Sequence, residues 1–372
     1  MPYIITEERR NEYRETSRIS RERKRNALAY NALEQIHPIN IPKYDPNYLM
    51  PWLPNNSIRT LSIFSGGGGL DLGFDKAGFQ HVASYEILDI CGQTLKRNRP
   101  NWNVFSGKAG DVQNVDWTIY KNRIELIHGG PPCQPFSIAG NQLGADDERN
   151  MWPSFIKAIK TIEPLFFVAE NVLGLLDPKF GDFLNEVVIN PLKDQYSIHK
   201  FVMNAADYGV PQIRKRVIFV GFRDHNSYLK YKRPIATHTK DVGLGFIENS
   251  WIGVREALGL PQIGFDCVSP TLRSGFTGPR KTTGVVNSQA SMKTWNELNI
   301  WPNGVQSSRE KAAKFPPENN NFRLSIKDCA LIQGFPHEWE FSGAVYQVLG
   351  QIGNSVCPPV AYNIAKSIVN IL

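Results

Sequence analysis

Cys133 lies in the stretch HGGPPCQPFS, residues 128–137, between prolines and shortly after two glycines. Prolines restrict the backbone, so Pro131, Pro132 and Pro135 would hold the sulfur at one angle. A free thiol has a pKa of about 8.5 and becomes a nucleophile at neutral pH only where fixed charges or dipoles favour the thiolate. The stretch therefore predicts a positioned nucleophile, and a buried, inert thiol is the alternative interpretation.

Glu170, in the stretch AEN of residues 169–171, is a second side chain placed to do chemistry. Both stretches end short apolar, β-rich runs, 124–129 and 165–171. If these runs are neighbouring parallel strands, Cys133 and Glu170 face one crevice beyond the carboxyl ends. A thiolate there can add to C6 of a pyrimidine while the carboxyl group bonds N3 and the exocyclic amine. C5 then becomes a carbanion that can take a methyl group.

The elements that position these side chains are strands that alternate with helices. Stretches of helical length and composition, such as 70–79 and 152–162, separate most of the apolar runs. This alternation predicts an α/β fold with a mostly parallel, doubly wound sheet whose ligands bind at the carboxyl edge. The runs are RTLSIF (59–64), HVASYE (81–86), IELIHG (124–129), LFFVAEN (165–171), YSIHKFVMN (196–204) and RVIFVGF (216–222).

A glycine-rich turn, FSGGGGLDLGF of residues 64–74, follows the first of these runs. Glycines let the backbone approach a ligand closely, and Glu86, about 20 residues on, is well placed to bind ribose hydroxyls. Asp111 follows a further strand. NAD and S-adenosylmethionine both fit such a site, and a tight turn without a ligand is the alternative. Because hydride transfer has no use for a thiol beside a carboxylate, Cys133 and Glu170 favour S-adenosylmethionine.

The chain resembles the DNA (cytosine-5)-methyltransferases, particularly the bacterial enzymes of restriction–modification systems. The resemblance covers most of residues 58–372 and is carried, in order, by FSGGGG, Glu86, Asp111, PPCQ, ENV, QIRKR, RLSIKDCALIQGFP and GNSV. It implies a Rossmann-like S-adenosylmethionine-dependent methyltransferase sheet with helices on both faces, plus a smaller loop-rich target-recognition domain. It also implies methylation of one cytosine in a short double-stranded DNA sequence, with the base flipped out of the duplex.

The resemblance further implies a role for individual residues. Cys133 is the nucleophile, Glu170 contacts N3 and N4 of the cytosine, Asn171 braces the loop, and Arg214 supports the base and the glutamate. For the cofactor, Phe64 stacks near the adenine, Gly66 and Gly68 approach the methionine moiety, Glu86 binds the ribose, Ile87 covers the adenine, Asp111 binds its amine, and Asn354 and Val356 close the site. The residues expected to contact DNA are Ser137, Arg216, Thr271, Arg273, Arg280 and Lys281.

A purely structural role remains the alternative interpretation for several of these residues. Core packing would explain Phe64 and Ile87, and an exposed strand-end ion pair would explain Arg214 and Arg216. The charges of the recognition domain could equally be solvated surface. No metal site is expected, because the five cysteines are scattered without ligand spacing.

Changes in composition and hydrophobic pattern along the chain predict four structural parts. Residues 1–57 form an N-terminal helical extension, 58–223 the catalytic and cofactor domain, 224–345 the target-recognition domain, and 346–372 a segment that completes the catalytic domain. The net charge is +7, and residues 224–322 contribute 12 basic against 8 acidic side chains, an excess of +4. A basic excess on one module suits a polyanion such as DNA.

Partners and location follow from the same pattern. The expected partner is double-stranded DNA, with no obligate protein partner; a cognate restriction endonuclease is linked functionally, not physically. No apolar stretch approaches a membrane-spanning length, so we expect a cytoplasmic protein. A catalytically silent DNA-binding repressor and a tRNA methyltransferase remain as alternative functions.

Overall fold

The computed structural model describes residues 38–132, 150–241, 249–276, 282–314 and 321–372. In the N-terminal extension it also describes residues 6–8, 10–11, 14–15, 18–19 and 22. All of these residues after Thr6 are helical, and Arg18 pairs with Glu15 at 2.7 Å and with Glu22 at 3.3 Å. These helical residues agree with the helical extension that the sequence predicts for this part of the chain.

A seven-stranded sheet with the order β3-β2-β1-β4-β5-β7-β6 forms the larger part of the molecule. The first five strands are parallel, and β7 runs antiparallel to both β5 and β6. The predicted mostly parallel α/β sheet is therefore confirmed. The strands are β1 (Arg59–Ile63), β2 (Gln80–Glu86), β3 (Val104–Ser106), β4 (Leu126–Gly129), β5 (Phe166–Val172), β6 (Ser197–Asn204) and β7 (Lys215–Phe222).

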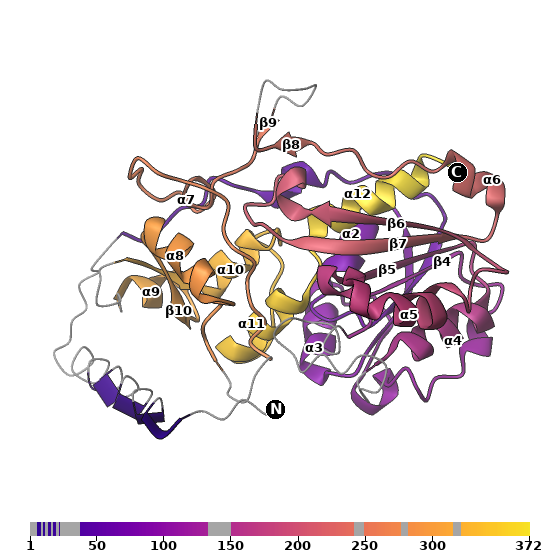
Figure 1. The fold of residues 1–372 in the computed structure, drawn as a ribbon, viewed down its shortest axis with the longest axis horizontal. Helices are drawn as coiled ribbons and strands as arrows, with labels where there is room; N and C mark the ends of the chain where they lie inside the picture. The colour runs from indigo at the N-terminus through magenta and orange to yellow at the C-terminus, as the bar shows by residue number, and fades with distance from the viewer. Residues whose placement is uncertain are drawn as a thin grey trace.

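Side-chain alternation along the central strands builds a core on each face of the sheet. Leu126 and Val168 pack with residues of α2 (Gly69–Lys76) and α12 (Pro358–Val369). Their neighbours Ile127 and Ala169 pack with residues of α4 (Trp152–Ile162) on the other face. In Figure 1, α2 and α12 lie above the strands and α4 lies below them. The remaining helices around the sheet are α3 (Asp89–Asn98), α5 (Gly181–Phe183) and α6 (His225–Lys230).

The chain order reverses between β1 and β4, because β1 pairs with β2 on one side and with β4 on the other. In open α/β sheets the ligand crevice lies at such a reversal, outside the carboxyl ends of the strands. The glycine turn follows β1, and the stretch that leads to Cys133 follows β4. Both predicted reactive regions therefore start at the reversal.

A second module, here the elements α7 to α10, lies beside the sheet (Figure 1). Its core contains Trp295, Ile300 and Leu324, and this core continues into Leu95 of α3 and Leu349 of α11 (Val345–Asn354). Its elements are α7 (Val254–Ala257), α8 (Gln289–Glu297), β10 (Ile300–Gln306), α9 (Arg309–Lys314), β11 (Phe322–Ser325) and α10 (Ile326–Ile332). A short pair, β8 (His238–Thr239) and β9 (Asn249–Ser250), precedes it.

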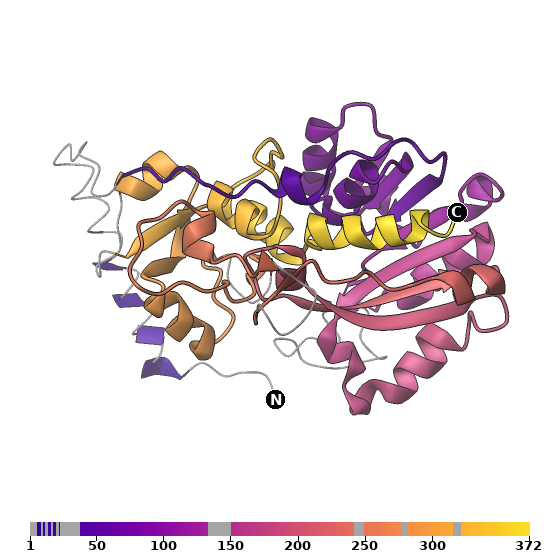
Figure 2. The same ribbon diagram turned by 90° about the horizontal axis from the view of Figure 1, so that it is seen from above.

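Helix α12 packs directly on α2, although the two are far apart in the sequence. A Cβ on Gly73 of α2 would overlap Ala361 of α12, and a Cβ on Gly69 would overlap the carbonyl oxygen of Val356. Figure 2 shows α12, in yellow, lying between the first strands and helices and the hairpin of β6 and β7. We expected this packing of the terminal stretch; the division of the chain into four domains stays a prediction.

Residues 38–57 run from the second module to α2. The amide of Lys43 donates to Ala257 O at 3.1 Å, and the amide of Leu53 donates to Lys76 O at 2.9 Å.

Among the described residues, no helix combines the length and the apolar character needed to cross a bilayer.

Candidate functional site

The glycine turn after β1 brings backbone N–H groups to the carboxyl edge of the sheet. Phe64 and Gly66 both adopt positive φ, 61° and 56°. A Cβ on Gly66 would meet no atom within 4 Å, so the space beside this residue is open. At Gly68, in contrast, a Cβ would lie 2.7 Å from Leu95 and from Trp339. Gly66 therefore fits close approach to a ligand, whereas Gly68 is also required for packing.

Glu86 ends β2 beside this turn and is 7% exposed. Its carboxylate accepts from the amide of Gly66 at 2.7 Å and from the amide of Leu88 at 2.9 Å. Burial raises the pKa of Glu86, and the backbone N–H groups oppose that shift. A carboxylate has about four lone-pair positions, so these bonds still leave an acceptor for a ribose hydroxyl.

The other residues expected near the adenine take less buried positions. Ile87 is 56% exposed, and the half-buried Phe64 ring lies 6.5 Å from the ring of Phe155. The Asp111 carboxylate accepts from the Gln113 amide at 3.1 Å and from Asn114 Nδ2 at 2.7 Å. These side chains lie at the carboxyl edge, and their roles toward a ligand stay predictions.

The segment that follows α11 packs against the glycine turn. Val356 is buried, and a Cβ on Gly67 would lie 2.8 Å from Ser355 Oγ. Asn354 is exposed at the end of α11. Trp339 Nε1 donates to Gly67 O at 3.1 Å, a contact that the sequence analysis missed. The only sequence signal for this contact is a tryptophan three residues after the QGFP motif.

Glu170 occupies a buried position on β5 and is 8% exposed. Arg216 Nε lies 2.8 Å from Glu170 Oε1, and both side chains are nearly enclosed. Burial raises the pKa of Glu170 even though Arg216 and Arg214 lower it. The site therefore favours the neutral carboxylic acid more than water does, which suits a proton or hydrogen-bond donor.

The guanidinium that pairs with Glu170 belongs to Arg216, whereas we expected this contact from Arg214. Strand register explains the difference: Arg216 pairs with Val172 on β5, so its side chain shares the face of Glu170, two residues away. Arg214 precedes β7 and donates from Nη2 to Gly353 O at 2.8 Å, against the last turn of α11. Arg214 is 3% exposed, and its charge also lowers the pKa of Glu170.

Asn171 anchors the proline stretch. Its Nδ2 donates to Pro131 O at 3.1 Å, two residues before Cys133, and the side chain is 1% exposed. A Cβ on Gly130 would lie 3.2 Å from Glu170 Oε2, so the chain that leads to Cys133 passes beside Glu170. Cys133 and Ser137 themselves lie outside the described residues.

The other four cysteines are thiols without a disulfide partner. Burial raises the pKa of Cys357 and of Cys267 to about 11 and that of Cys91 and Cys329 further. None of them is a thiolate at neutral pH, as expected for inert core cysteines.

Two of the four residues expected to contact DNA from the second part of the chain are described. Thr271 Oγ1 donates to Ile213 O at 2.5 Å, and the amide of Arg273 donates to Val285 O at 2.9 Å. Both residues are half-buried. Arg280 and Lys281 lie outside the described residues.

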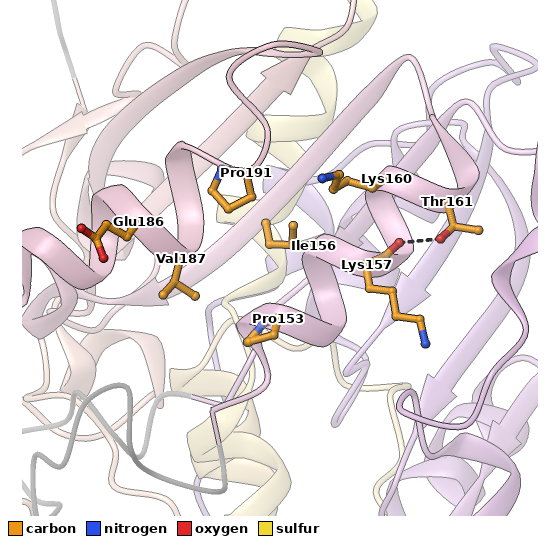
Figure 3. Close-up of a pocket in the computed structure, with 8 residues that line it drawn as sticks. All are labelled: Pro153, Ile156, Lys157, Lys160, Thr161, Glu186, Val187 and Pro191. Atoms are coloured by element: carbon orange, nitrogen blue, oxygen red, sulfur yellow. Dashed lines mark hydrogen bonds between the residues drawn. The ribbon is translucent and has the colours of Figure 1, made fainter.

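A surface groove of about 550 Å³ lies along α4 and the segment Leu184–Ile189 (Figure 3). Lys157 and Lys160 of α4 and Glu186 are its charged side chains. No residue predicted to bind cofactor, base or DNA lines this groove.

Comparisons with known proteins agree with this geometry. A family model described as C-5 cytosine-specific DNA methylase matches residues 58–370. The Type II methyltransferase M.NgoMIV of Neisseria gonorrhoeae is 37% identical over 324 residues, which cover 84% of this chain and 97% of that protein. The Type II methyltransferase M.PspPI of Psychrobacter sp. (strain TA137) is 34% identical, with 86% and 80% covered.

Among solved structures, the methyltransferase EhMeth of Entamoeba histolytica matches with a TM-score of 0.59 over 85% of this chain and 99% of that one. At 17% identity this match shows a shared fold alone. The chain thus has the α/β fold of that methyltransferase. The chain belongs to the C-5 cytosine-specific DNA methylases, and it is a DNA (cytosine-5)-methyltransferase. The predicted family is therefore confirmed.

Proposed function

We propose that this enzyme uses S-adenosylmethionine to methylate C5 of one cytosine within a short double-stranded DNA sequence, through covalent attack of Cys133 on C6 of a flipped-out base. The methylated sites would protect host DNA from a cognate restriction endonuclease. The observation that carries the proposal is the buried pair of Glu170 and Arg216 beside the Gly130–Pro132 chain that leads to Cys133.

The residues around the glycine turn fit S-adenosylmethionine. The open space at Gly66 and the buried carboxylate of Glu86 together offer room and hydrogen-bond acceptors at the carboxyl end of β1. Glu86 would hold the ribose, Asp111 the adenine amine, and Asn354 with Val356 would close the site. When bound, S-adenosylmethionine supplies an electrophilic methyl group.

The residues on the base side would act in sequence. As a neutral acid, Glu170 donates its O–H to N3 of cytosine, and its other oxygen accepts from the exocyclic amine. When the Cys133 thiolate bonds to C6, the electron pair of the C5–C6 bond moves to C5, and the donor at N3 stabilises the charge that spreads over the ring. After C5 has gained the methyl group, water takes the C5 proton, the electron pair of that C–H bond forms the C5–C6 double bond again, and the Cys133 thiolate leaves C6 with the electron pair of the C–S bond.

Asn171 and Arg216 would position these groups. Asn171 fixes Pro131 and therefore the start of the proline stretch. Arg216 holds the Glu170 carboxyl group in one orientation. Thr271, Arg273, Arg280 and Lys281 are the proposed DNA contacts of the recognition domain.

Sequencing tests the function directly. DNA from cells that express the chain is sequenced by bisulfite or nanopore methods, with cells that express Cys133→Ser as the control. We expect 5-methylcytosine at one short sequence in the first sample alone. Absence of methylated cytosine from the DNA, with methylated cytosine found in tRNA in a parallel assay, would overturn the assignment of duplex DNA as the substrate.

A further inference from the structure

A directed chain of buried hydrogen bonds connects the second module's side of the molecule to the glycine turn. The Leu272 amide donates to Gln212 Oε1 at 3.0 Å, and Gln212 Nε2 donates to Gln333 Oε1 at 2.9 Å. Gln333 Nε2 then donates to Ser355 O at 2.6 Å. Gln212 and Gln333, here the Gln212–Gln333 pair, are both 0% exposed.

The orientation of both amides is fixed by the ends of this chain. It starts at a backbone N–H, which can only donate, and it ends at a backbone carbonyl, which can only accept. The second hydrogen of Gln212 Nε2 is also used, because it donates to Ile332 O at 3.2 Å. Flipping either amide would bring two donors or two acceptors together, which is costly in a buried site.

One end of the chain holds the residues that lead into the base site. The amide of Ser269 donates to Pro211 O at 2.9 Å, and the amide of Ile213 donates to Ser269 O at 2.8 Å. Residues 269–272 therefore lie along 211–213, directly before Arg214 and Arg216. A shift of this stretch would move the arginines that act on Glu170.

The other end holds the cover of the glycine turn. Ser355 lies against Gly67, and the next residue, Val356, lies against Gly69. Gln333 follows α10, the last helix of the second module, and Ser355 follows α11, which lies next to α10 in Figure 1. The pair thus spans from residues 269–272 to the cofactor turn through the side chains of two residues.

We propose that Gln212 and Gln333 are positioning residues: they hold Thr271–Leu272 in register with the glycine turn, so that binding of DNA and binding of S-adenosylmethionine strengthen each other. The inference rests on the proposed function. Because a hydrogen bond is sensitive to both distance and direction, a chain without an alternative arrangement transmits displacement at one end to the other. Removal of one link should therefore uncouple the two ligands more than it weakens either one.

The test uses isosteric variants of the full-length enzyme. Gln212→Glu replaces the donor toward Gln333 by an acceptor, and Gln333→Glu does the same toward Ser355 O. Asn40→Asp is the matched control. Asn40 is a buried amide that donates to Leu258 O and to Asp328 Oδ1, both at 3.0 Å, and it lies outside the chain. Gln333→Met removes the donor without a buried charge, so the test stays open if the carboxylate variants do not fold.

The measurement is the affinity for S-adenosylhomocysteine by calorimetry, without DNA and with saturating duplex DNA. The duplex contains the recognition sequence that the sequencing experiment identifies. For the wild type we expect the duplex to raise the affinity about tenfold, a typical size for coupling between sites. The Gln212→Glu and Gln333→Met variants should bring this factor to about twofold or less and raise KM for DNA. The control should keep the factor even though its melting temperature falls.

A pH series sharpens the readout. In Gln212→Glu the introduced carboxyl group, once protonated, can donate to Gln333 again, so coupling should return as the pH falls. The inference is wrong if the coupling factor is unchanged in the Gln212 and Gln333 variants, or if Asn40→Asp reduces this factor as much as they do. In either case, methylation of DNA by the wild type still supports the proposed function. Absence of DNA methylation by the wild type would instead remove the function on which the inference rests.

Discussion

Removal of the charge of Arg216 should move the pH dependence of methyl transfer. The guanidinium lies 2.8 Å from the carboxylate, and the two side chains are 15% and 10% exposed. At an effective dielectric constant of about 20, this separation corresponds to a Coulomb attraction of about 6 kcal/mol. Relaxation and water entry reduce the effect, and about 3 kcal/mol is a realistic cost of removing one partner from a buried pair.

The carboxyl group of Glu170 can avoid this cost by binding a proton. Loss of the positive neighbour disfavours the carboxylate, so in Arg216→Met the pKa of Glu170, already raised by burial, should rise further. A cost of about 3 kcal/mol corresponds to about two pKa units. Because neutral Glu170 is the proposed donor to N3, activity falls at high pH as the carboxyl group ionises. The alkaline limb of the profile should therefore move up by about two units.

The assay is kcat/KM for DNA between pH 6 and about 10, which reports groups of the free enzyme. Arg216→Lys keeps the charge and should leave the limb near its wild-type position, with a lower turnover because the geometry of the guanidinium is lost. Glu170→Gln donates at every pH, so its residual activity should lack the limb. A limb that stays in place in Arg216→Met, or that moves equally in Arg216→Lys, would refute the reasoning.

Three further predictions concern nucleophile, packing and acid stability. Cys133→Ser should abolish methyl transfer but keep the calorimetric affinity for S-adenosylhomocysteine, and duplex DNA with 5-fluorocytosine should trap a covalent adduct, visible by denaturing electrophoresis, with the wild type alone. Gly69→Ala should lower the unfolding free energy by about 1–3 kcal/mol and weaken cofactor binding, because the new Cβ overlaps Val356 O, whereas Gly181→Ala meets no atom within 4 Å and should do neither. Burial lowers the pKa of His128 from 6.5 to about 3, so its contribution to stability is full above pH 6.5 and is lost as the pH falls toward 3. Urea unfolding of His128→Leu should thus show about 2 kcal/mol less loss of stability between pH 7 and pH 5 than the wild type.

Most of the sheet could be predicted because its strands are short apolar runs bounded by polar or glycine residues. Four of the six predicted runs differ from β1, β2, β6 and β7 by one residue at one end. The run 165–171 is shifted by one residue from β5, and the sixth run starts two residues before β4. The strand β3 was expected only from its place before Asp111, since Val104–Ser106 is too short to form a run and Phe105 is 39% exposed. Glu86 and Glu170 could be placed because each ends or nearly ends its own strand.

Other contacts could not be predicted because they depend on long-range pairing. Only the register between β5 and β7 decides that Arg216 and not Arg214 reaches Glu170. The bond between Gln212 and Gln333 joins residues 121 positions apart, and no local pattern links them. The glycine turn also packs against Ser355 and Val356, and its sequence motif does not predict this contact either.

The packing of α12 on α2 has a consequence for the newly made protein. The turn that would hold the methyl donor is translated early, but the residues that cover it leave the ribosome only after the whole second module. During elongation the central strands can pair while this half of the pocket stays open to water. A chain whose translation stops before α11 would therefore contain Cys133, Glu170 and the second module but not the residues that cover the glycine turn. Under the proposed function, we expect such incomplete products to bind S-adenosylmethionine poorly, so that methyl transfer depends on the docking of the last helix.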